Sequence, residues 1–516
     1  MRSFVTTVLF IMSLSAFAQE ISYSPQFEEI RGTWMDDLII MDNGKTALIS
    51  ISEDDGVDVT IYGTDHKILA HAKTENDKWT QRKLSAANFK GLYDINGDIV
   101  IFISQLNRGN MQSMHRLVIS AENGQLKSAE KLGEIPTRRN YGNMINQSMR
   151  LNDYYVAVDE KSGNYAILAY EGYTDDYADK IKVTVYDKTH KALKTAVAGK
   201  EINKARFTQF AAMYMHNDDV YVCTNDYDPK STSMRTPFFV SVLRHDANEM
   251  VSKKLDIFPY KNTSNTSMKF NPGNNMMQLI TLTEISKDTK TSFSGRTTEN
   301  IDYGAIVSFI DGETLQLIST KQHTNQLADL YAKKVLGDKE GYHGGLPGMF
   351  INHDNTTTMI SEEGKSINGH AYNGQMGITI LDKNGRELEA YVMNIPEIAG
   401  NIYTSNTGGG VYKKYYFSTP SGNYILMNDL PENLEKGPKE EPHKLSTISD
   451  ANTILCKLQD GKIQKSYLYG LPKEKRSAKF SKFYNIHYHK ASNTLALLMV
   501  DNAKGDKMSQ IAWIKL

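Results

Sequence analysis

The sequence has 516 residues, of which 23% are charged, with 59 Lys and Arg residues against 60 Asp and Glu residues. The formal net charge of -1 excludes the basic excess that non-specific nucleic-acid binding requires, so no nucleic-acid partner is expected. Hydrophobic residues make up 40% of the chain, which provides a core and argues against a disordered chain and a membrane protein.

Residues 1–18 have the pattern of a secretory signal peptide. Arg2 supplies a positive charge, residues 4–17 are mostly apolar, and Ala16 and Ala18 occupy the positions that a signal peptidase recognises. We therefore expect cleavage before Gln19 and export of a bacterial protein to the periplasm or the cell exterior. The alternatives are a buried N-terminal strand and a membrane anchor, although the run is shorter than the ~20 residues of a spanning helix. The residue directly after the cleavage point is Gln19 rather than a cysteine, and no second long apolar stretch exists, so neither a lipid anchor nor a transmembrane segment is expected.

Two cysteines, Cys223 and Cys456, fall in apparent strands that are far apart in the chain. The expected compartment permits a disulfide between them. Cysteines inside separate strands are more often buried thiols, which is the favoured interpretation. No Cys/His spacing typical of a metal site is present.

Most of the sequence after residue 40 consists of short β-rich runs separated by turn residues. The first recurring pattern is a turn followed by a strongly apolar strand. It occurs eight times: Asn43-Gly44 before 46–51, Asn96-Gly97 before 99–103, Ser162-Gly163 before 165–170, Asn217-Asp218 before 220–224, Pro272-Gly273 before 276–282, Asp354-Asn355 before 357–360, Ser421-Gly422 before 424–427 and Ser492-Asn493 before 495–500.

The second pattern is a strand, a tight polar turn and another strand, and it alternates strictly with the first. It occurs seven times: 57–62 turning at Asp65-His66, 117–120 at Asn123-Gly124, 183–186 at Lys188-Thr189, 238–243 at Asp246-Ala247, 305–310 at Asp311-Gly312, 378–381 at Asn384-Gly385 and 453–458 at Asp460-Gly461. Each repeat unit therefore holds four strands, A to D, with short A–B and C–D turns of the Asn-Gly and Asp-Gly type.

The eighth unit has only three strands, because residues 511–516 supply its third strand and the sequence then ends. Residues 21–31 precede the first unit and are the candidate for the missing fourth strand. A ring in which an N-terminal strand completes the last blade has no exposed sheet edge there. We predict an all-β fold, a single β-propeller domain over residues 19–516 with eight four-stranded blades of about 62 residues each. The alternatives are seven blades and two stacked β-domains.

Two of the A–B turns, Asn271-Pro272-Gly273-Asn274 and Thr419-Pro420-Ser421-Gly422, resemble the repeats of TolB-like propellers. In that family a turn of the Ser-Pro-Asp-Gly type joins the first two strands of a blade. Most copies in this sequence lack the proline, and the predicted number of blades exceeds the six of that family. The resemblance implies a propeller that acts as a recognition platform.

The loops of the predicted propeller are asymmetric. The A–B and C–D turns are short and share one face of the disc, named here the short-turn face. The B–C and D–A connections share the opposite, long-loop face, which we expect to be the binding face because insertions in repeat proteins gather there. The long-loop face carries nearly all the irregular sequence: 133–150, 171–180, 226–236, 286–301, 322–348, 362–375, 394–410, 429–450 and 471–482.

Several long loops carry candidate binding residues. Arg138, Arg139 and Tyr141 combine two guanidinium groups with an aromatic ring, which suits carboxylate, phosphate or glycan contacts. The alternative is that these arginines pair with neighbouring carboxylates on a solvated rim. Two other loops place tyrosines beside acids that are candidate Ca²⁺ ligands, unless they are solvated loop acids: Tyr177 with Asp175, Asp176 and Asp179, and Tyr227 with Asp226 and Asp228.

The glycine-rich segment 341–348 follows a predicted short helix over 325–336, in which Leu327, Leu330 and Tyr331 share one face. One interpretation is a flexible loop that presents Tyr342 and His343 to a ligand. The other is a helix packed on the rim, with the glycines turning the chain into the next blade. His487 and His489 share one side of a strand but lack an identifiable third metal ligand.

The sequence contains no Gly-x-Ser-x-Gly elbow, no His-Glu-x-x-His helix, no phosphate-binding Gly-x-x-x-x-Gly-Lys loop and no dinucleotide motif. We therefore predict a secreted or periplasmic monomeric protein that binds a protein or glycan through its long-loop face. One alternative is a hydrolase or lyase acting on polysaccharide or peptide, with Asp175, Asp176, Asp226 and Asp228 as its acids. The other is a structural component of the cell envelope.

Overall fold

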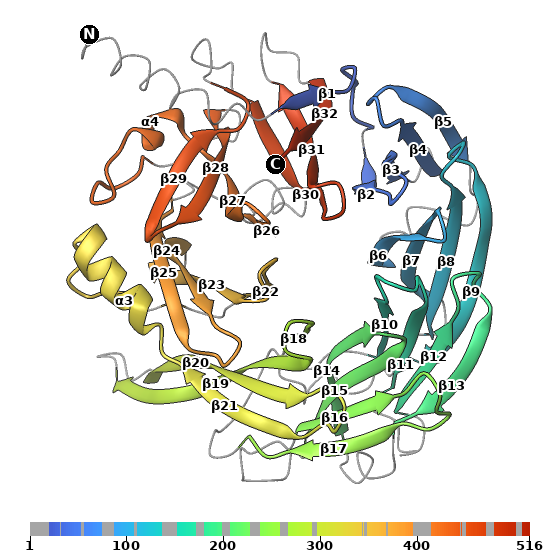
Figure 1. Cartoon of the computed structure of the whole chain (residues 1–516), viewed down its shortest axis with the longest axis horizontal. Helices are drawn as coiled ribbons and strands as arrows, with labels where there is room; N and C mark the ends of the chain where they lie inside the picture. Colours follow the sequence, from blue (N-terminus) through green and yellow to red (C-terminus); the bar gives the residue numbers. More distant parts are fainter. Residues whose placement is uncertain are drawn as a thin grey trace, which may run out of the picture.

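The computed structural model describes residues 20–30, 32–52, 56–74, 87–107, 111–136, 152–171, 180–198, 207–227, 238–257, 267–291, 297–342, 344, 348–367, 370–395, 414–443, 445, 450–470, 479–501 and 508–516. The described strands form eight four-stranded antiparallel sheets arranged in a ring (Figure 1). The chain is therefore an all-β, eight-bladed propeller. The predicted fold class and number of blades are confirmed, and seven blades or two stacked β-domains are excluded.

Each blade runs in chain order from its inner strand to its outer strand, except that the N-terminal strand β1 (Ile21–Tyr23) is the outer strand of blade 8. Blades 1 to 4 comprise β2 (Thr33–Ile40), β3 (Thr46–Ser52), β4 (Gly56–Tyr62), β5 (Ile68–Thr74); β6 (Ala87–Ile95), β7 (Asp98–Asn107), β8 (Met111–Ser120), β9 (Leu126–Pro136); β10 (Asp153–Val158), β11 (Tyr165–Tyr170), β12 (Ile181–Tyr186), β13 (Ala192–Val197); and β14 (Phe207–His216), β15 (Asp219–Tyr227), β16 (Phe238–Leu243), β17 (Val251–Leu255).

Blades 5 to 8 follow the same plan, with long inserted segments around blades 6 and 7. They comprise β18 (Ser267–Asn271), β19 (Met276–Thr291), β20 (Thr297–Asp311), β21 (Leu317–His323); β22 (Gly348–Ile351), β23 (Thr357–Ile367), β24 (His370–Leu381), β25 (Glu387–Asn394); β26 (Tyr415–Thr419), β27 (Gly422–Asp429), β28 (Asn452–Gln459), β29 (Lys462–Tyr467); and β30 (Lys479–His489), β31 (Thr494–Asp501), β32 (Met508–Lys515). The described helices are α3 (Gln326–Tyr331), the π-helical turn η2 (Ala332–Leu336) and α4 (Pro431–Leu434).

The ring closes through blade 8. Strand β1 pairs antiparallel with β32, with Ile21 opposite Ile514 and Tyr23 opposite Ala512. Figure 1 shows this N-terminal strand beside the C-terminal strands of blade 8. The predicted closure by the segment before the first unit is confirmed. We name the junction between blades 8 and 1 the seam.

The tight turns use the residues that the sequence pattern indicates. Asn96 and Gly97 have φ values of 56° and 78°, and Asn217 and Asp218 have values of 49° and 64°. Two successive residues with positive φ define the two-residue hairpin turn whose twist matches that of the flanking strands. These turns fix the register of the inner hairpin in each of the two blades.

Most sheets bury apolar side chains on both faces, because each blade is covered by its neighbour on either side. In β15, Val220 and Val222 pack toward blade 3, whereas Tyr221 and Cys223 pack toward blade 5. Cys223 and Cys456 are free, buried thiols, as the favoured interpretation predicted. Burial raises the pKa of both thiols to about 12, so neither is a reactive thiolate at neutral pH.

Two loops that were predicted to be irregular are extensions of hairpins. Strands β19 and β20 continue to Thr291 and Thr297, and β23 and β24 continue to Ile367 and His370. The prediction was wrong over most of 286–301 and 362–375. Their Ser, Thr and Lys content resembles that of a loop, but threonine favours strands when a hairpin partner is present.

The predicted helix over 325–336 is confirmed as α3 followed by η2. Its buried face differs from the prediction, since Ala328 and Ala332 are fully buried whereas Leu330 is 41% exposed. No helix within the described ranges is long and apolar enough to cross a bilayer.

Candidate functional site

Most of the predicted site residues lie outside the described residues: Arg138, Arg139, Tyr141, Tyr177, His343, Asp175, Asp176, Asp179 and Asp228. Asp226 and Tyr227 end strand β15, where their backbones pair with Thr208 and Phe207 of β14. Within the described parts of the chain, no group of three or more His, Cys, Asp or Glu side chains is placed to hold a metal ion. The Ca²⁺ site and the arginine-tyrosine site remain predictions.

Tyr342 lies in the described structure and is 4% exposed. Its hydroxyl donates to the carbonyl oxygen of Ser361 at 2.8 Å and lies 2.7 Å from the Ser361 hydroxyl. A Cβ atom on Gly377 would come within 2.3 Å of the Tyr342 ring, so that position must be glycine for the ring to fit. In this conformation Tyr342 packs the inserted segment onto blade 6, as the alternative interpretation expects.

Two largely buried lysines near the long-loop face form ion pairs with carboxylates of a neighbouring blade. Lys90 of blade 2 pairs with Asp153 of blade 3 at 2.5 Å, and Lys414 before blade 7 pairs with Glu362 of blade 6 at 2.8 Å. The Lys90 and Lys414 side chains are only 12% and 10% exposed. Burial lowers the pKa of Lys414, and its partner carboxylate opposes that shift. Such pairs hold charge at fixed positions around the ring axis.

A polar layer accompanies these ion pairs below the long-loop face. In blade 2, the Gln112 side-chain amide donates to Ser104 at 3.0 Å and contacts Asp153 at 3.4 Å. Among the described residues, the buried Gln105 Nε2 and Asn452 Nδ2 have no hydrogen-bond partner. Most buried polar groups in proteins have such a partner.

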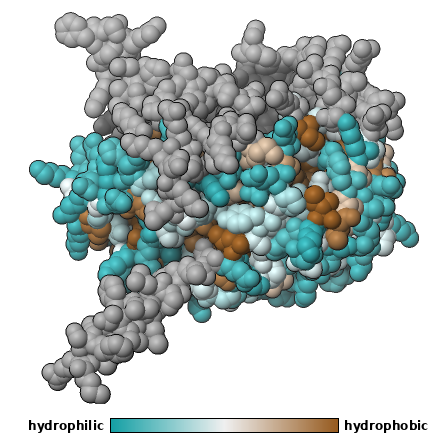
Figure 2. All heavy atoms as spheres, turned by 90° about the horizontal axis from the view of Figure 1, so that it is seen from above, coloured by the Kyte–Doolittle hydropathy of each residue, from teal (hydrophilic) through white to brown (hydrophobic). Residues whose placement is uncertain are grey.

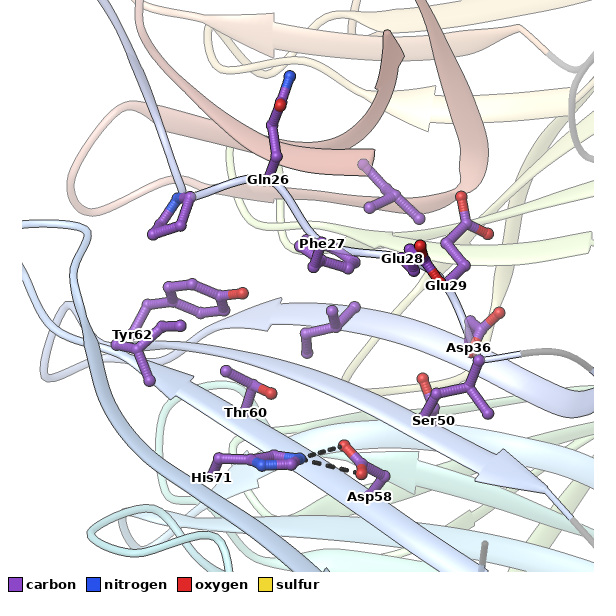
Figure 3. A pocket seen from close by; sticks show the side chains of 15 residues that line it. Gln26, Phe27, Glu28, Glu29, Asp36, Ser50, Asp58, Thr60, Tyr62 and His71 are labelled. Atoms are coloured by element: carbon purple, nitrogen blue, oxygen red, sulfur yellow. Dashed lines mark hydrogen bonds and ion pairs between the residues drawn. The ribbon is translucent and has the colours of Figure 1, made fainter. Parts of the chain in front are cut away.

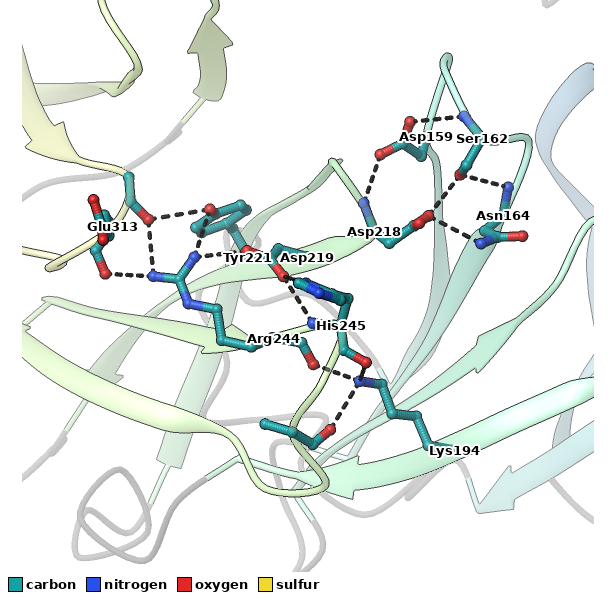
Figure 4. Close-up of polar contacts among 12 residues, drawn as sticks. Asp159, Ser162, Asn164, Lys194, Asp218, Asp219, Tyr221, Arg244, His245 and Glu313 are labelled. Carbon is teal, nitrogen blue, oxygen red and sulfur yellow. Dashed lines mark hydrogen bonds and ion pairs between the residues drawn. The ribbon is translucent and has the colours of Figure 1, made fainter.

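The polar groups of the short-turn face form hydrogen bonds with one another (Figure 4). The Asp218 amide of blade 4 donates to Asp159 of blade 3 at 2.8 Å, and the Ser162 hydroxyl donates to the Asp218 carboxylate at 2.6 Å. Lys490 of blade 8 reaches Glu160 of blade 3 across the centre of the ring at 3.7 Å. The polar groups of these turns therefore serve the contacts between blades.

A pocket of about 340 Å³ lies at the seam between residues 25–30 and the face of blade 1 (Figure 3). It is defined here as the seam pocket and is lined by Pro25, Gln26, Phe27, Glu28, Glu29, Ile30, Asp36, Leu48, Ser50, Asp58, Thr60, Tyr62, Ile68, His71 and Leu498. Its volume falls within the roughly 300–1,000 Å³ of small-ligand sites.

The sequence of blade 1 explains why this pocket forms. In β4, Val57, Val59 and Ile61 pack against blade 2, so the alternate residues Asp58 and Thr60 face the seam. Most other blades bury apolar residues on both faces. The outer strand of blade 8 is only three residues long, so it covers little of this polar surface.

One wall of the seam pocket is the face of blade 1, and the other is the segment 25–30 with Phe27, Glu28 and Glu29. His71 Nε2 lies 3.0 Å from both carboxylate oxygens of Asp58, and the Thr33 hydroxyl donates to Asp36 at 2.9 Å. Glu29 pairs with Lys482. Burial raises the pKa of Asp36, an effect that hydrogen bonds from Ser50 and Thr33 partly offset.

Carboxylates that accept hydroxyl protons, together with aromatic rings that cover apolar ring faces, match a polyhydroxylated ligand. Phe27 lies across the pocket from the face of blade 1, on which Asp58, Thr60 and Tyr62 are alternate residues of β4 (Figure 3). Sequence reasoning did not identify this site. The available signal was the alternation in 56–62, which places Asp58 and Thr60 on one face; the equivalent strand 181–186 of blade 3 alternates in the same way, so the pattern alone does not single out blade 1.

The chain belongs to the class of eight-bladed β-propellers on the evidence of its sheets and its closure. No protein-family model matches the sequence, and no curated protein matches it. Among solved structures, the chain is similar to the polysaccharide lyase Uly1, with 9% identity, a TM-score of 0.40 and coverage of 83% of this chain and 90% of that chain.

The chain is also similar to the β-propeller domain of the Trilobed protease from Pyrococcus furiosus, which is described as having an open velcro topology. This similarity has 11% identity, a TM-score of 0.35 and coverage of 84% of this chain and 99% of that chain. At these values both similarities concern the propeller fold alone. The propeller fold implied by the resemblance to TolB-like repeats is observed, and the role as a recognition platform stays a prediction.

Proposed function

We propose that this protein is an exported β-propeller that binds a glycan, with one sugar-sized unit in the seam pocket and the remainder along the long-loop face. The single observation that carries the proposal is the seam pocket, where the face of blade 1 with Asp58, Thr60 and His71 lies opposite the Phe27 ring.

A glycan array followed by calorimetric titration of the selected glycan tests this proposal. We expect Asp58→Asn and Thr60→Val each to weaken binding about tenfold or more, because each removes a hydrogen-bonding group from the pocket floor. Asp246→Asn, which changes an exposed carboxylate on the short-turn face, is the matched control and should leave affinity unchanged. Equal affinity for all three variants and the parent protein would refute the assignment to the seam pocket.

The same titration tests the predicted contribution of the long loops. Alanine at Arg138, Arg139 and Tyr141 should reduce affinity for a longer glycan more than for its terminal unit. Cleavage of the glycan during the titration would favour the hydrolase or lyase alternative. Capture of a protein from a periplasmic extract, with no glycan bound on the array, would favour protein recognition.

A further inference from the structure

The charged side chains that line the seam pocket are mainly acidic. Four carboxylates and no lysine or arginine stand among its described lining residues; the carboxylates are Glu28, Glu29, Asp36 and Asp58. His71 is the one basic side chain in this set. A pocket with such a balance of charge attracts a cation and repels an anion. The charge of the seam pocket therefore bears on which glycan it takes.

Two of the four carboxylates have basic side chains beside them. Glu29 pairs with Lys482 of β30. Asp58 lies 3.0 Å from His71 Nε2, and Lys73 lies opposite Asp58 in the pairing of β4 with β5. The charges of Glu29 and Asp58 are thus offset to a large extent within the protein.

Asp36 has no such partner. Among the described residues it forms no ion pair, and its carboxylate accepts the Thr33 hydroxyl at 2.9 Å. Burial raises the pKa of Asp36, and the Ser50 and Thr33 hydroxyls lower it in part. The charge of Glu29 raises this pKa further, whereas that of Lys482, which is paired with Glu29, lowers it. A cation bound beside Asp36 would therefore stabilise a carboxylate whose charge the protein compensates poorly.

The pairing of the strands sets the spacing between Asp36 and Asp58. Asp36 lies opposite Ser50 of β3, and Ser50 lies opposite Asp58 of β4, so the three side chains form one row on the seam face of blade 1. Neighbouring strands are ~4.8 Å apart, which places the Cα atoms of Asp36 and Asp58 roughly 10 Å apart. Figure 3 shows Ser50 between the two carboxylates. This spacing leaves room for one sugar ring above Ser50.

We propose that the seam pocket selects an amino sugar with a free ammonium group, an inference that rests on the proposed binding of a glycan. The ammonium group would donate to the Asp36 carboxylate, and neighbouring hydroxyls would bind Asp58 and Thr60. Phe27 would cover one face of the sugar ring. An N-acetylated sugar has an amide in place of the ammonium group, so it lacks the bond between opposite charges. A uronate would bring a second negative charge to the pocket, which is unfavourable.

Calorimetric titration of the full mature chain with three tetrasaccharides tests the proposal. The probes are the tetramers of glucosamine, N-acetylglucosamine and galacturonate, at about pH 6, where a sugar amine is protonated. We expect the glucosamine tetramer to bind at least about tenfold more tightly than the N-acetylglucosamine tetramer, and the galacturonate tetramer to bind most weakly.

The outcomes of this titration separate the amino sugar from glycan binding in general. Equal or tighter binding of either other tetramer overturns the amino-sugar assignment and leaves the proposed glycan binding intact. The assignment is also overturned if none of the three tetramers binds while the glycan array yields another ligand. An array without any bound glycan overturns both proposals.

The variant Asp36→Asn locates the ammonium group. The amide keeps an acceptor for Thr33 and removes the charge, so we expect the preference for glucosamine over N-acetylglucosamine to fall at least about tenfold. Retained binding of the N-acetylglucosamine tetramer shows that the pocket is folded. The matched control is Asp37→Asn, at the next residue of β2, which is also partly buried and points to the opposite face of the sheet. This control should leave the preference unchanged. The same preference in both variants, or an equal loss of both glycans in Asp36→Asn, would contradict the assignment of the ammonium group to Asp36.

Discussion

Single cations join neighbouring blades by donating to the carbonyl oxygens of the next C–D turn. Lys194 of blade 3 donates to His245 of blade 4 at 2.8 Å, and Arg244 of blade 4 donates to Gly312 of blade 5 at 3.0 Å (Figure 4). Each contact binds two turns that are far apart in the sequence. Charged donors of this kind are stronger than neutral ones, so they help to fix the angle between blades.

Burial shifts the pKa values of two side chains on inner strands, His487 and Asp37, in opposite directions. Burial lowers the pKa of His487 to about 4, with a further decrease from His489 and a partial increase from Asp42; its Nδ1 accepts the Ile40 amide at 3.2 Å. Burial raises the pKa of Asp37 to about 7, although the Leu38 amide lowers it in part.

These shifts predict how stability depends on pH. The contribution of neutral His487 to the unfolding free energy is fully present above its unfolded pKa of about 6.5. This contribution is lost as the pH falls toward 4. The Asp37 contribution is present at low pH and is lost as pH rises from about 3.8 toward 7. We expect His487→Gln to reduce the loss of unfolding free energy between pH 6.5 and 4.5 by about 2 kcal/mol. Asp37→Asn should increase that loss.

Urea denaturation of the parent and both variants at pH 6.5 and 4.5 measures these changes. Comparing each protein with itself at the two pH values removes the effect of the substitution on packing. A pH dependence identical in all three proteins would contradict both assignments.

Strand β1 closes the ring although it is only three residues long. Ser24 continues the pairing with β32 through both its backbone amide and its side-chain hydroxyl. The Ser24 amide donates to the Ile511 carbonyl, and its hydroxyl accepts the Ile511 amide, each at 2.9 Å. Pairing resumes at Phe27 opposite Ser509. The Ser24 hydroxyl takes the place of the Ser24 carbonyl as acceptor, because that carbonyl accepts the Gln510 side-chain amide at 2.8 Å.

The register of β1 predicts which of its amides hold the seam. Ser24 donates inward, so Ser22, opposite Trp513, also points its amide toward β32, whereas the amide of Tyr23 points outward. We expect Ser22→Pro to lower the unfolding free energy by about 1–3 kcal/mol, because a strand hydrogen bond is removed.

Tyr23→Pro is the control at the adjacent residue and should be less destabilising. Amide hydrogen exchange of Trp513 reports the same seam locally and should accelerate more in Ser22→Pro than in Tyr23→Pro. Equal effects of the two prolines would show that β1 does not hold the seam through its backbone.

The elements that could be predicted from the sequence are those specified by neighbouring residues. Turns such as Asn96-Gly97 and the apolar strands after them depend on local chemistry, so the four-stranded units and their number were correct. The hairpin extensions beyond Leu282 and Ile360 were missed, since their strand character depends on a partner strand rather than on an apolar pattern.

At the scale of the whole molecule, the ring brings together residues that no local pattern connects. The seam pocket joins residues 25–30 to Asp58, His71 and Leu498, and a second pocket, on the outer rim between blades 6 and 7, joins η2 to β29. Sequence reasoning could identify the long-loop face, because loop lengths are visible in the sequence. It could not identify either pocket, because each depends on how far the neighbouring blade or inserted segment covers a sheet.

Because strands from the two ends of the chain share blade 8, the fold predicts which circular permutants are stable. Ile21 lies opposite Ile514 in one sheet, so a short linker can join the two ends. Opening the chain between Lys383 and Asn384, in the C–D turn of blade 6, makes β25 an N-terminal outer strand, as β1 is in the parent. Opening it within residues 258–266, between β17 and β18, leaves no blade shared by the two ends.

We expect the permutant opened in blade 6 to have the far-UV circular dichroism spectrum of the parent and an unfolding free energy within about 2 kcal/mol of it. The permutant opened between blades 4 and 5 should be less stable by several kcal/mol, because only side-chain contacts then join its first and last blades. Urea denaturation followed by tryptophan fluorescence measures both, since one of the three indoles, Trp513, is 2% exposed and donates to Thr46 across the original seam at 2.9 Å. Equal stability of the two permutants would show that contacts between blades close the ring without a shared sheet.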